Sequence, residues 1–285
     1  MLRGINMVLL SLPQIDNIQL LDDIIANKKT GHKEKLQQYR DQVIDRYKFF
    51  ESHFDALDEI KPLDVAVWHD VRDDLYSCYG NNVAFNKVKA KLFSGLARCP
   101  YCTLNRPNTL DHYYDKSDYP EFAVYFPNLI PCCSECNSIK GTSLFNDVGT
   151  RQFIHFYFDE VPEFQYLFAR FTIEPNDGIP QVVVSLNFGE NQEYEKQIRA
   201  HYNKLNLLKK YQNTIVGRIP SVLDELRIAK ENGMTNDNFR EVLMIRFQSL
   251  SKNYGLNYWE TSMYEGILNS DGFLDGLFLL INSVS

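Results

Sequence analysis

The first third of the chain repeats its apolar residues with the period of an α-helix. Between residues 36 and 57, large apolar side chains recur at three- and four-residue steps, which places them on one helix face. The same spacing predicts a second helix over 64–76 and a third over 83–96. We therefore expect a helical N-terminal region that spans residues 1–90.

The hydrophobic pattern changes after the middle of the chain. Segments 165–173 and 181–188 are rich in aromatic and β-branched residues, and Pro-Asn-Asp-Gly at 175–178 supplies turn residues between them. This predicts a β-hairpin at the start of a C-terminal region, 151–285. Helical spacing then returns, and Thr235 is placed to cap the third helix. These helices are expected over 190–211, 216–232, 236–253 and 258–281. The whole pattern predicts a mainly helical α+β fold.

The middle of the chain is marked by its cysteines. The chain has six, and five fall between residues 99 and 136, where two Cys-x-x-Cys pairs are separated by 30 residues. Two such pairs can supply four thiolates to a tetrahedral zinc ion, which leaves no open position and makes the site structural. The alternative is a chance pairing of core cysteines. Cys132, which breaks the two-residue spacing, and Cys78 are expected to be buried thiols. The predicted zinc ligands are Cys99, Cys102, Cys133 and Cys136.

A structural zinc leaves several polar residues around the cysteines unexplained. Asp111 and His112 form an Asp-His pair, Asn128 begins an Asn-Leu pair, and Asn137 directly follows the last cysteine in Cys-x-x-Cys-Asn-x-x-Lys. Over residues 110–141 this order and spacing resemble the HNH nucleases, which have the ββα-metal fold, and above all their branch with two zinc knuckles. The resemblance covers roughly 95–145. It implies a zinc-stabilised ββα-metal module over 91–150, embedded between helical regions.

The chemistry of a nuclease assigns roles to these residues. Phosphodiester hydrolysis needs an activated water and stabilisation of the charge on the phosphate and leaving group. A neutral imidazole accepts a proton near pH 7, so His112 is the candidate general base. Mg²⁺ or Mn²⁺ prefers oxygen ligands, which Asp111 and the amide of Asn137 can supply. The resemblance further implies that Asn128 holds the hairpin loop and orients the histidine, and that cleavage leaves a 3′-hydroxyl and a 5′-phosphate.

Basic residues near the module have open roles. Lys140 and Gly141 fit the end of a helix after the second knuckle, and Lys140 either contacts a phosphate or lies in solvent. Arg98, Arg106 and Lys116 could hold a DNA backbone, although each alone is weak support.

Two aromatic segments also allow alternative interpretations. The stretch 113–126 is expected to cover the zinc-centred core, and stacking on unpaired bases is the alternative. Over 153–159 we expect a buried strand in which His155 is satisfied. The alternative there is a second functional patch of His155 and Asp159.

The formal net charge of −7 is unevenly distributed. Residues 1–75 and 151–285 each carry a net charge of −4, whereas residues 76–150 carry +1. Because affinity for DNA depends strongly on neutralising phosphates, the isolated chain is expected to bind DNA weakly. No apolar run approaches the roughly 18 residues that cross a bilayer, and the start of the chain lacks a signal-peptide cleavage site. We therefore expect a cytoplasmic protein that does not contact membranes.

The leading functional prediction is a metal-dependent DNA endonuclease with structural Zn²⁺ and catalytic Mg²⁺ or Mn²⁺. The aromatic sequence after the Asp-His pair is also similar to nuclease subunits of Septu-type and retron-associated antiphage systems, which implies an ATPase partner. A second copy of the chain, in a homo-oligomer, is the alternative partner that would bring DNA to the site. Two alternatives stay open, a stand-alone restriction-type HNH enzyme and a noncatalytic zinc-binding interaction module. A thiol redox protein is disfavoured because zinc-bound thiolates are locked away from exchange.

Overall fold

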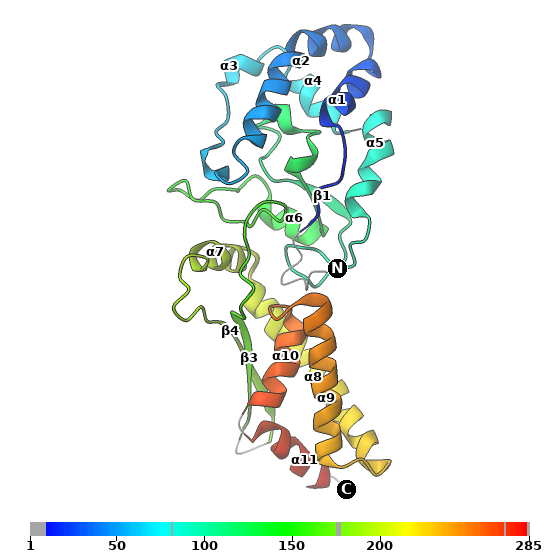
Figure 1. Ribbon diagram of the computed structural model, residues 1–285, viewed down its shortest axis with the longest axis vertical. Coiled ribbons are helices and arrows are strands. Elements are labelled where there is room, and N and C mark those ends of the chain that lie inside the picture. Colours follow the sequence, from blue (N-terminus) through cyan, green and yellow to red (C-terminus); the bar gives the residue numbers. More distant parts are fainter. Residues whose placement is uncertain (1–9, 81, 175–177, 271, 284–285) are drawn as a thin grey trace. The chain divides into compact units, whose positions relative to one another are not determined.

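The computed structural model divides into two compact units, Leu10–Glu160 and Val161–Ser285 (Figure 1). The boundary expected near residue 90 lies inside the first unit, and the boundary expected near 150 precedes the observed division. None of the described helices is long and apolar enough to cross a bilayer. The expectation for the start of the chain falls largely on residues outside those described. The structure describes residues 10–80, 82–174, 178–270 and 272–283.

The first unit combines one helix of 22 residues, several shorter helices and a small β-hairpin. The helix expected over 36–57 is confirmed as α2, whereas the helix expected over 64–76 is two short helices, because the chain turns between Trp68 and Val71. The helix expected over 83–96 is α5 followed by a 3-10 turn. Its elements are α1 (Asn17–Ala26), α2 (Thr30–Glu51), η1 (Leu57–Glu59), α3 (Val65–Trp68), α4 (Arg72–Cys78), α5 (Val83–Lys89), η2 (Ala90–Phe93), β1 (Thr109–His112), η3 (Pro120–Phe122), η4 (Phe126–Asn128), β2 (Leu129–Cys132) and α6 (Ser134–Lys140).

Aromatic rings form the core of the first unit. Helix α2 packs its rings against the segment that connects β1 and β2, with Tyr47 stacked on Tyr125 at 4.2 Å between ring centroids. Phe50 contacts Phe122 edge-on at 5.2 Å. The large rings of 113–126 are buried, which confirms that they cover the core and leaves none of them open to stack on bases.

A buried ion pair fixes α2 against the same connection. Arg46 donates from Nε to Glu121 Oε1 at 2.9 Å, and its terminal nitrogen donates to the backbone oxygen of Lys61 at 2.9 Å. The Glu121 side chain is fully buried. Burial raises the pKa of this carboxyl, and the nearby charge of Arg46 opposes the rise. Removing either partner alone would leave an uncompensated buried charge.

The segment around His155 differs from the expected strand. Residues 153–159 form turns, because Asp159 accepts from the backbone N–H of His155 at 2.7 Å and closes the chain on itself. Asp159 also pairs with Arg151 through two hydrogen bonds of 2.8 and 3.0 Å. The imidazole of His155 is buried against Tyr113 and Phe158. The predicted strand is therefore wrong, and the predicted burial of His155 is confirmed.

The described residues of the second unit form a β-hairpin and five helices. The hairpin is confirmed, with Leu167 opposite Leu186 and Ile173 opposite Pro180. The predicted turn falls mainly on 175–177, outside the described residues. Thr235 caps α9 through a capping box, as expected. Helix α7 ends at Asn206, whose φ of 53° is left-handed, so α8 begins earlier than predicted. The elements are β3 (Leu167–Ile173), β4 (Pro180–Leu186), α7 (Glu195–Leu205), α8 (Leu207–Glu231), α9 (Asn236–Tyr254), α10 (Trp259–Asn269) and α11 (Phe273–Ser283).

Helix α10 packs unusually close to β3. A Cβ atom at Gly266 would lie 2.0 Å from the backbone oxygen of Ala169 and 3.0 Å from the ring of Phe171. Ser262, one turn earlier, donates to the backbone oxygen of Leu167 at 3.0 Å. The helix therefore rests directly on strand backbone, which only glycine permits at that position.

Replacing Gly266 with Ala should destabilise the second unit by about 1–3 kcal/mol or more, since the methyl group must push the helix away from β3. Gly217 of α8 is the matched control, because nothing lies within 4 Å of its Cβ position. Gly217→Ala should raise stability by about 0.5–1 kcal/mol. Urea unfolding of both variants measures the difference, and equal effects would contradict the close packing.

Replacing His155 with Phe should make the first unit less sensitive to acid. Burial, and then the charge of Arg151, hold the pKa of His155 well below its ordinary value of 6.5. Below pH 6.5 the unfolded state therefore binds more protons than the folded state, and stability falls as pH falls. The melting temperature of His155→Phe minus that of wild type should become more positive as the pH falls from 7.5 to 5. An equal shift at both values would show that His155 does not titrate differently on unfolding.

Candidate metal centre and catalytic residues

The β1–β2 hairpin brings the two cysteine pairs together. The strands are antiparallel, with Thr109 opposite Cys132 and His112 opposite Leu129. The first pair precedes β1 and the second follows β2, so the hairpin returns the chain to its starting point. Helix α6 then begins at Ser134. The local order is thus strand, strand and helix around one cluster of cysteines.

Four cysteine sulfurs converge on one point. The Sγ atoms of Cys99, Cys102, Cys133 and Cys136 all lie within 4.8 Å of one another, and all four residues are buried. The sulfurs of Cys102 and Cys133 are 3.8 Å apart. In a tetrahedral site with Zn–S bonds of about 2.3 Å, sulfur atoms are separated by about 3.8 Å. The four predicted ligands therefore fit a structural zinc ion.

The other two cysteines lie outside this cluster, as expected. Cys132 points to Thr109, whose Oγ1 is 3.5 Å from its Sγ, and burial raises the pKa of its thiol to about 12. Cys78 donates to the backbone oxygen of Asp74 and is buried in the helical core. Each is a protonated core thiol.

A backbone donor at the cluster favours negative charge on a sulfur. The backbone N–H of Cys133 donates to the sulfur of Cys99 at 3.3 Å. Before the hairpin, a tight turn returns the chain, with Thr103 at a left-handed φ of 55° and its N–H bonded to the oxygen of Cys99 at 2.7 Å. The N–H of Cys133 would help to stabilise the negative charge that four thiolates bring to a zinc site, and the turn at Thr103 shapes the first knuckle.

His112 is held rigidly at the end of β1. Its Nε2 lies 2.9 Å from the backbone oxygen of Ala123, which can only accept, so Nε2 carries the proton. The lone pair of the neutral ring is then on Nδ1. Burial, supported by the charges of Lys116 and Lys140, lowers the pKa of His112 to about 3. The imidazole is therefore neutral near pH 7 and has one accepting nitrogen.

Asp111 belongs to a buried ion pair that the sequence did not reveal. Its Oδ1 accepts from Lys140 Nζ at 2.9 Å, and its Oδ2 accepts from the hydroxyl of Tyr101 at 2.6 Å. Lys140 is 1% exposed and also donates to the backbone oxygen of His112 at 2.7 Å. Burial raises the pKa of Asp111, opposed by the charge of Lys140. Both roles considered for Lys140, phosphate contact and solvated surface residue, are therefore wrong. The predicted helix end is confirmed, because α6 stops at Lys140.

The two asparagines have different surroundings. Asn128 is fully buried; its Oδ1 accepts from the N–H of Tyr114 at 2.8 Å, and its Nδ2 donates to the backbone oxygen of Tyr114 at 3.0 Å. It thus pins the loop after β1. Asn137 is partly buried on α6 and donates from Nδ2 to Thr109 Oγ1 at 3.2 Å.

These contacts bear on the catalytic cation expected at Asp111 and Asn137. Both oxygens of Asp111 already accept hydrogen bonds, and the carboxylate is already paired with the ammonium of Lys140. A divalent ion bound there would face a like charge in a buried site. As arranged, the two residues do not form an open oxygen site for Mg²⁺ or Mn²⁺.

Sequence reasoning missed Tyr79, which follows α4 and packs its ring on that of His112 at 4.4 Å between centroids. No motif marks this tyrosine, since it lies in the turn after α4, far from His112 in the sequence. Among the basic residues considered, Lys116 lies over the ring of Tyr79 at 4.8 Å. Arg98 instead donates to the backbone oxygen of Leu104, within the first knuckle.

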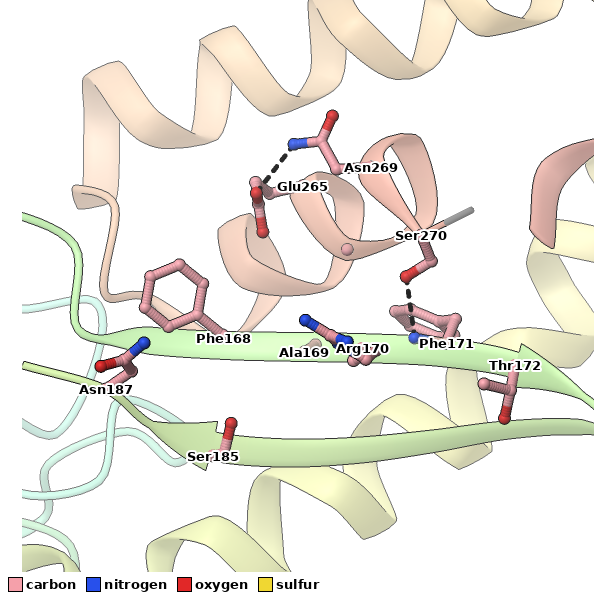
Figure 2. Close-up of a pocket in the computed structure, with 11 residues that line it drawn as sticks. Phe168, Ala169, Arg170, Phe171, Thr172, Ser185, Asn187, Glu265, Asn269 and Ser270 are labelled. Atoms are coloured by element: carbon pink, nitrogen blue, oxygen red, sulfur yellow. Dashed lines mark hydrogen bonds between the residues drawn. The ribbon is translucent and has the colours of Figure 1, made fainter. Parts of the chain in front are cut away.

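A separate hollow lies in the second unit. Figure 2 shows this space of about 470 Å³ between β3 and α10, with Arg170 and Glu265 among its labelled lining residues. Glu265 accepts a hydrogen bond from Asn269 at 2.8 Å. The described lining contains neither histidine nor cysteine, so it offers none of the chemistry found at the hairpin.

The cysteine assignment predicts the outcome of two neighbouring substitutions. Cys133→Ala should abolish zinc binding and remove the cooperative unfolding transition of the first unit, because a structural zinc contributes about 10–16 kcal/mol of apparent binding energy. Cys132→Ala, one residue away, should retain one zinc per chain. Metal analysis by mass spectrometry and thermal unfolding measure both. If Cys132→Ala loses zinc and Cys133→Ala keeps it, Cys132 is the ligand and the assignment of Cys133 is wrong.

Comparisons with known proteins give one distant relative. Protein ea31 of Escherichia phage lambda is 24% identical over 242 residues, which cover 79% of this chain and 81% of the relative. No protein-family model matches the chain, and no solved structure matches it significantly. The chain is thus similar to a phage protein over most of its length.

Proposed function

We propose that this protein is an HNH-type endonuclease that hydrolyses phosphodiester bonds in DNA, with His112 as the general base. The observation that supports it most is the fixed, neutral imidazole, whose Nε2 is bound to Ala123 and whose accepting nitrogen is Nδ1. The order of β1, β2 and α6 around four buried cysteines adds support, since it is the order of the ββα-metal fold.

In the proposed reaction, His112 Nδ1 removes a proton from water as its oxygen bonds to phosphorus. The bond from phosphorus to the 3′ oxygen breaks, and that oxygen leaves and gains a proton from solvent. Zinc would hold the knuckles, and thereby β1, in place. Asn128 acts as a positioning residue, because it fixes the loop that follows His112. The expected cation at Asp111 and Asn137 has no part in these steps.

The rival function is a noncatalytic zinc module that binds another macromolecule. It is favoured because the polar side-chain atoms of Asp111 and Asn128 form hydrogen bonds within the protein. It gives no reason for the orientation of the histidine, and the nuclease does. A role in antiphage defence has no added support, since the relative found is itself from a phage.

The test is cleavage of supercoiled plasmid in the presence of Mg²⁺ or Mn²⁺. His112→Ala should lower the rate by about 10²–10⁴-fold, the usual contribution of a general base. His155→Phe is the matched control, because it alters the other buried histidine of the same unit and should leave the rate within a few-fold.

Zinc content and melting temperature must be unchanged in His112→Ala for the loss to report on chemistry. Equal cleavage by wild type and His112→Ala would refute the assignment of the base. No cleavage of plasmid by wild type under any of these metals would favour the noncatalytic module.

A further inference from the structure

Two lysines converge on the tyrosine that packs against His112. The ammonium of Lys89, the last residue of α5, lies 5.1 Å from the ring centre of Tyr79, and that of Lys116 lies 4.8 Å away. Lys116 also lies 4.0 Å from the ring of Tyr76, which is 45% exposed. The lysines come from segments on opposite sides of the candidate base in the sequence, and one aromatic ring separates them from it.

These two charges have no anionic partner among the residues that the structure describes. Among the described residues, no carboxylate lies within ion-pair distance of Lys89 or Lys116. Asp115, the nearest acid in sequence to Lys116, instead accepts from the N–H and hydroxyl of Ser117. Two ammonium groups drawn to one ring repel each other, so an anion bound between them would be favoured.

The aromatic rings explain how the lysines stay in place without an acid. An ammonium over an aromatic face gains about 0.5–1 kcal/mol at an exposed site. It keeps its N–H groups free, because the ring offers a face and no acceptor atom. Tyr76 and Tyr79 therefore orient both chains while leaving their donors available to phosphate oxygens. Two lysines at one place can bind phosphate locally even though residues 76–150 carry a net charge of only +1.

We propose that Lys89 and Lys116, held by Tyr79 and Tyr76, bind phosphates of the nucleic-acid backbone beside the bond presented to His112. The proposal rests on the proposed function and extends it, because it assigns the groups that hold the substrate strand. The chemistry is recognition of phosphodiester oxygens and is independent of base sequence.

Binding is tested apart from cleavage. Fluorescence anisotropy of a labelled 20-base-pair duplex, in the His112→Ala background and without added divalent cation, gives the affinity over a range of salt concentrations. Lys89→Ala/Lys116→Ala should weaken binding about tenfold at low salt. It should reduce the slope of log affinity against log salt by nearly 2, since each lost phosphate contact removes about 0.9.

Lys87→Ala is the matched control. It lies on the same helix, but lines a cavity with Asp16 and Asp23 near α1. Its affinity and salt slope should stay as in the parent. Lys89→Arg/Lys116→Arg should restore binding. Millimolar inorganic phosphate should compete poorly, and full competition at that concentration would show a site for free phosphate instead of a strand.

The proposal is overturned if the double alanine variant keeps the parental affinity and slope, or if the parent binds no duplex. Its failure is distinguishable from that of the proposed function. Wild-type protein that binds duplex through these lysines and never cuts plasmid would refute the nuclease alone. Cleavage that is unaffected by the double variant would refute the lysine site alone.

Discussion

Convergence of four sulfurs on one point is the constraint on which the candidate site depends. A hairpin of two four-residue strands is marginal in water on its own, and within the described residues β1 and β2 pair only with each other. Closing both of its ends at the cysteine cluster fixes its register. That register places Asp111 and His112 at the end of β1 and sets the start of α6. Every polar contact described around His112 is built on that geometry.

The aromatic core provides the second half of the support. The connection between β1 and β2 contains the carbonyl that fixes His112 and the backbone groups held by Asn128. This connection has almost no regular structure, and it is ordered because α2 packs rings and the Arg46–Glu121 pair against it. The helical N-terminal part is therefore not a separate arm. It packs against the connection between β1 and β2 and holds that loop of the candidate site in one conformation.

Much of this arrangement followed from local patterns, and the rest depended on contacts distant in sequence. The Cys-x-x-Cys spacing identified the four clustered cysteines. The content of aromatic and β-branched residues, with turn residues between the two segments, identified the β3–β4 hairpin. Helix α1 was missed, although Asp16 caps it. The Asp111–Lys140 pair and the contact of Tyr79 with His112 were not predicted, because a motif gives the spacing of residues and not which side chains meet in the fold. The strand predicted over 153–159 was wrong, because a run of buried aromatic residues is compatible with turns as well as with a strand.

The ion pair of Lys140 also links the carboxylate of Asp111 to the metal cluster. Lys140 is the last residue of α6, and the same short helix includes Cys136 of the metal cluster. A change that separates Asp111 from Lys140 would destabilise the end of that helix. It would therefore weaken the binding of a metal by Cys133 and Cys136. By thermodynamic reciprocity, occupancy of the sulfur cluster must in turn change the free energy of moving Asp111. Metal load and the readiness of the carboxylate to change partner would then be one coupled equilibrium.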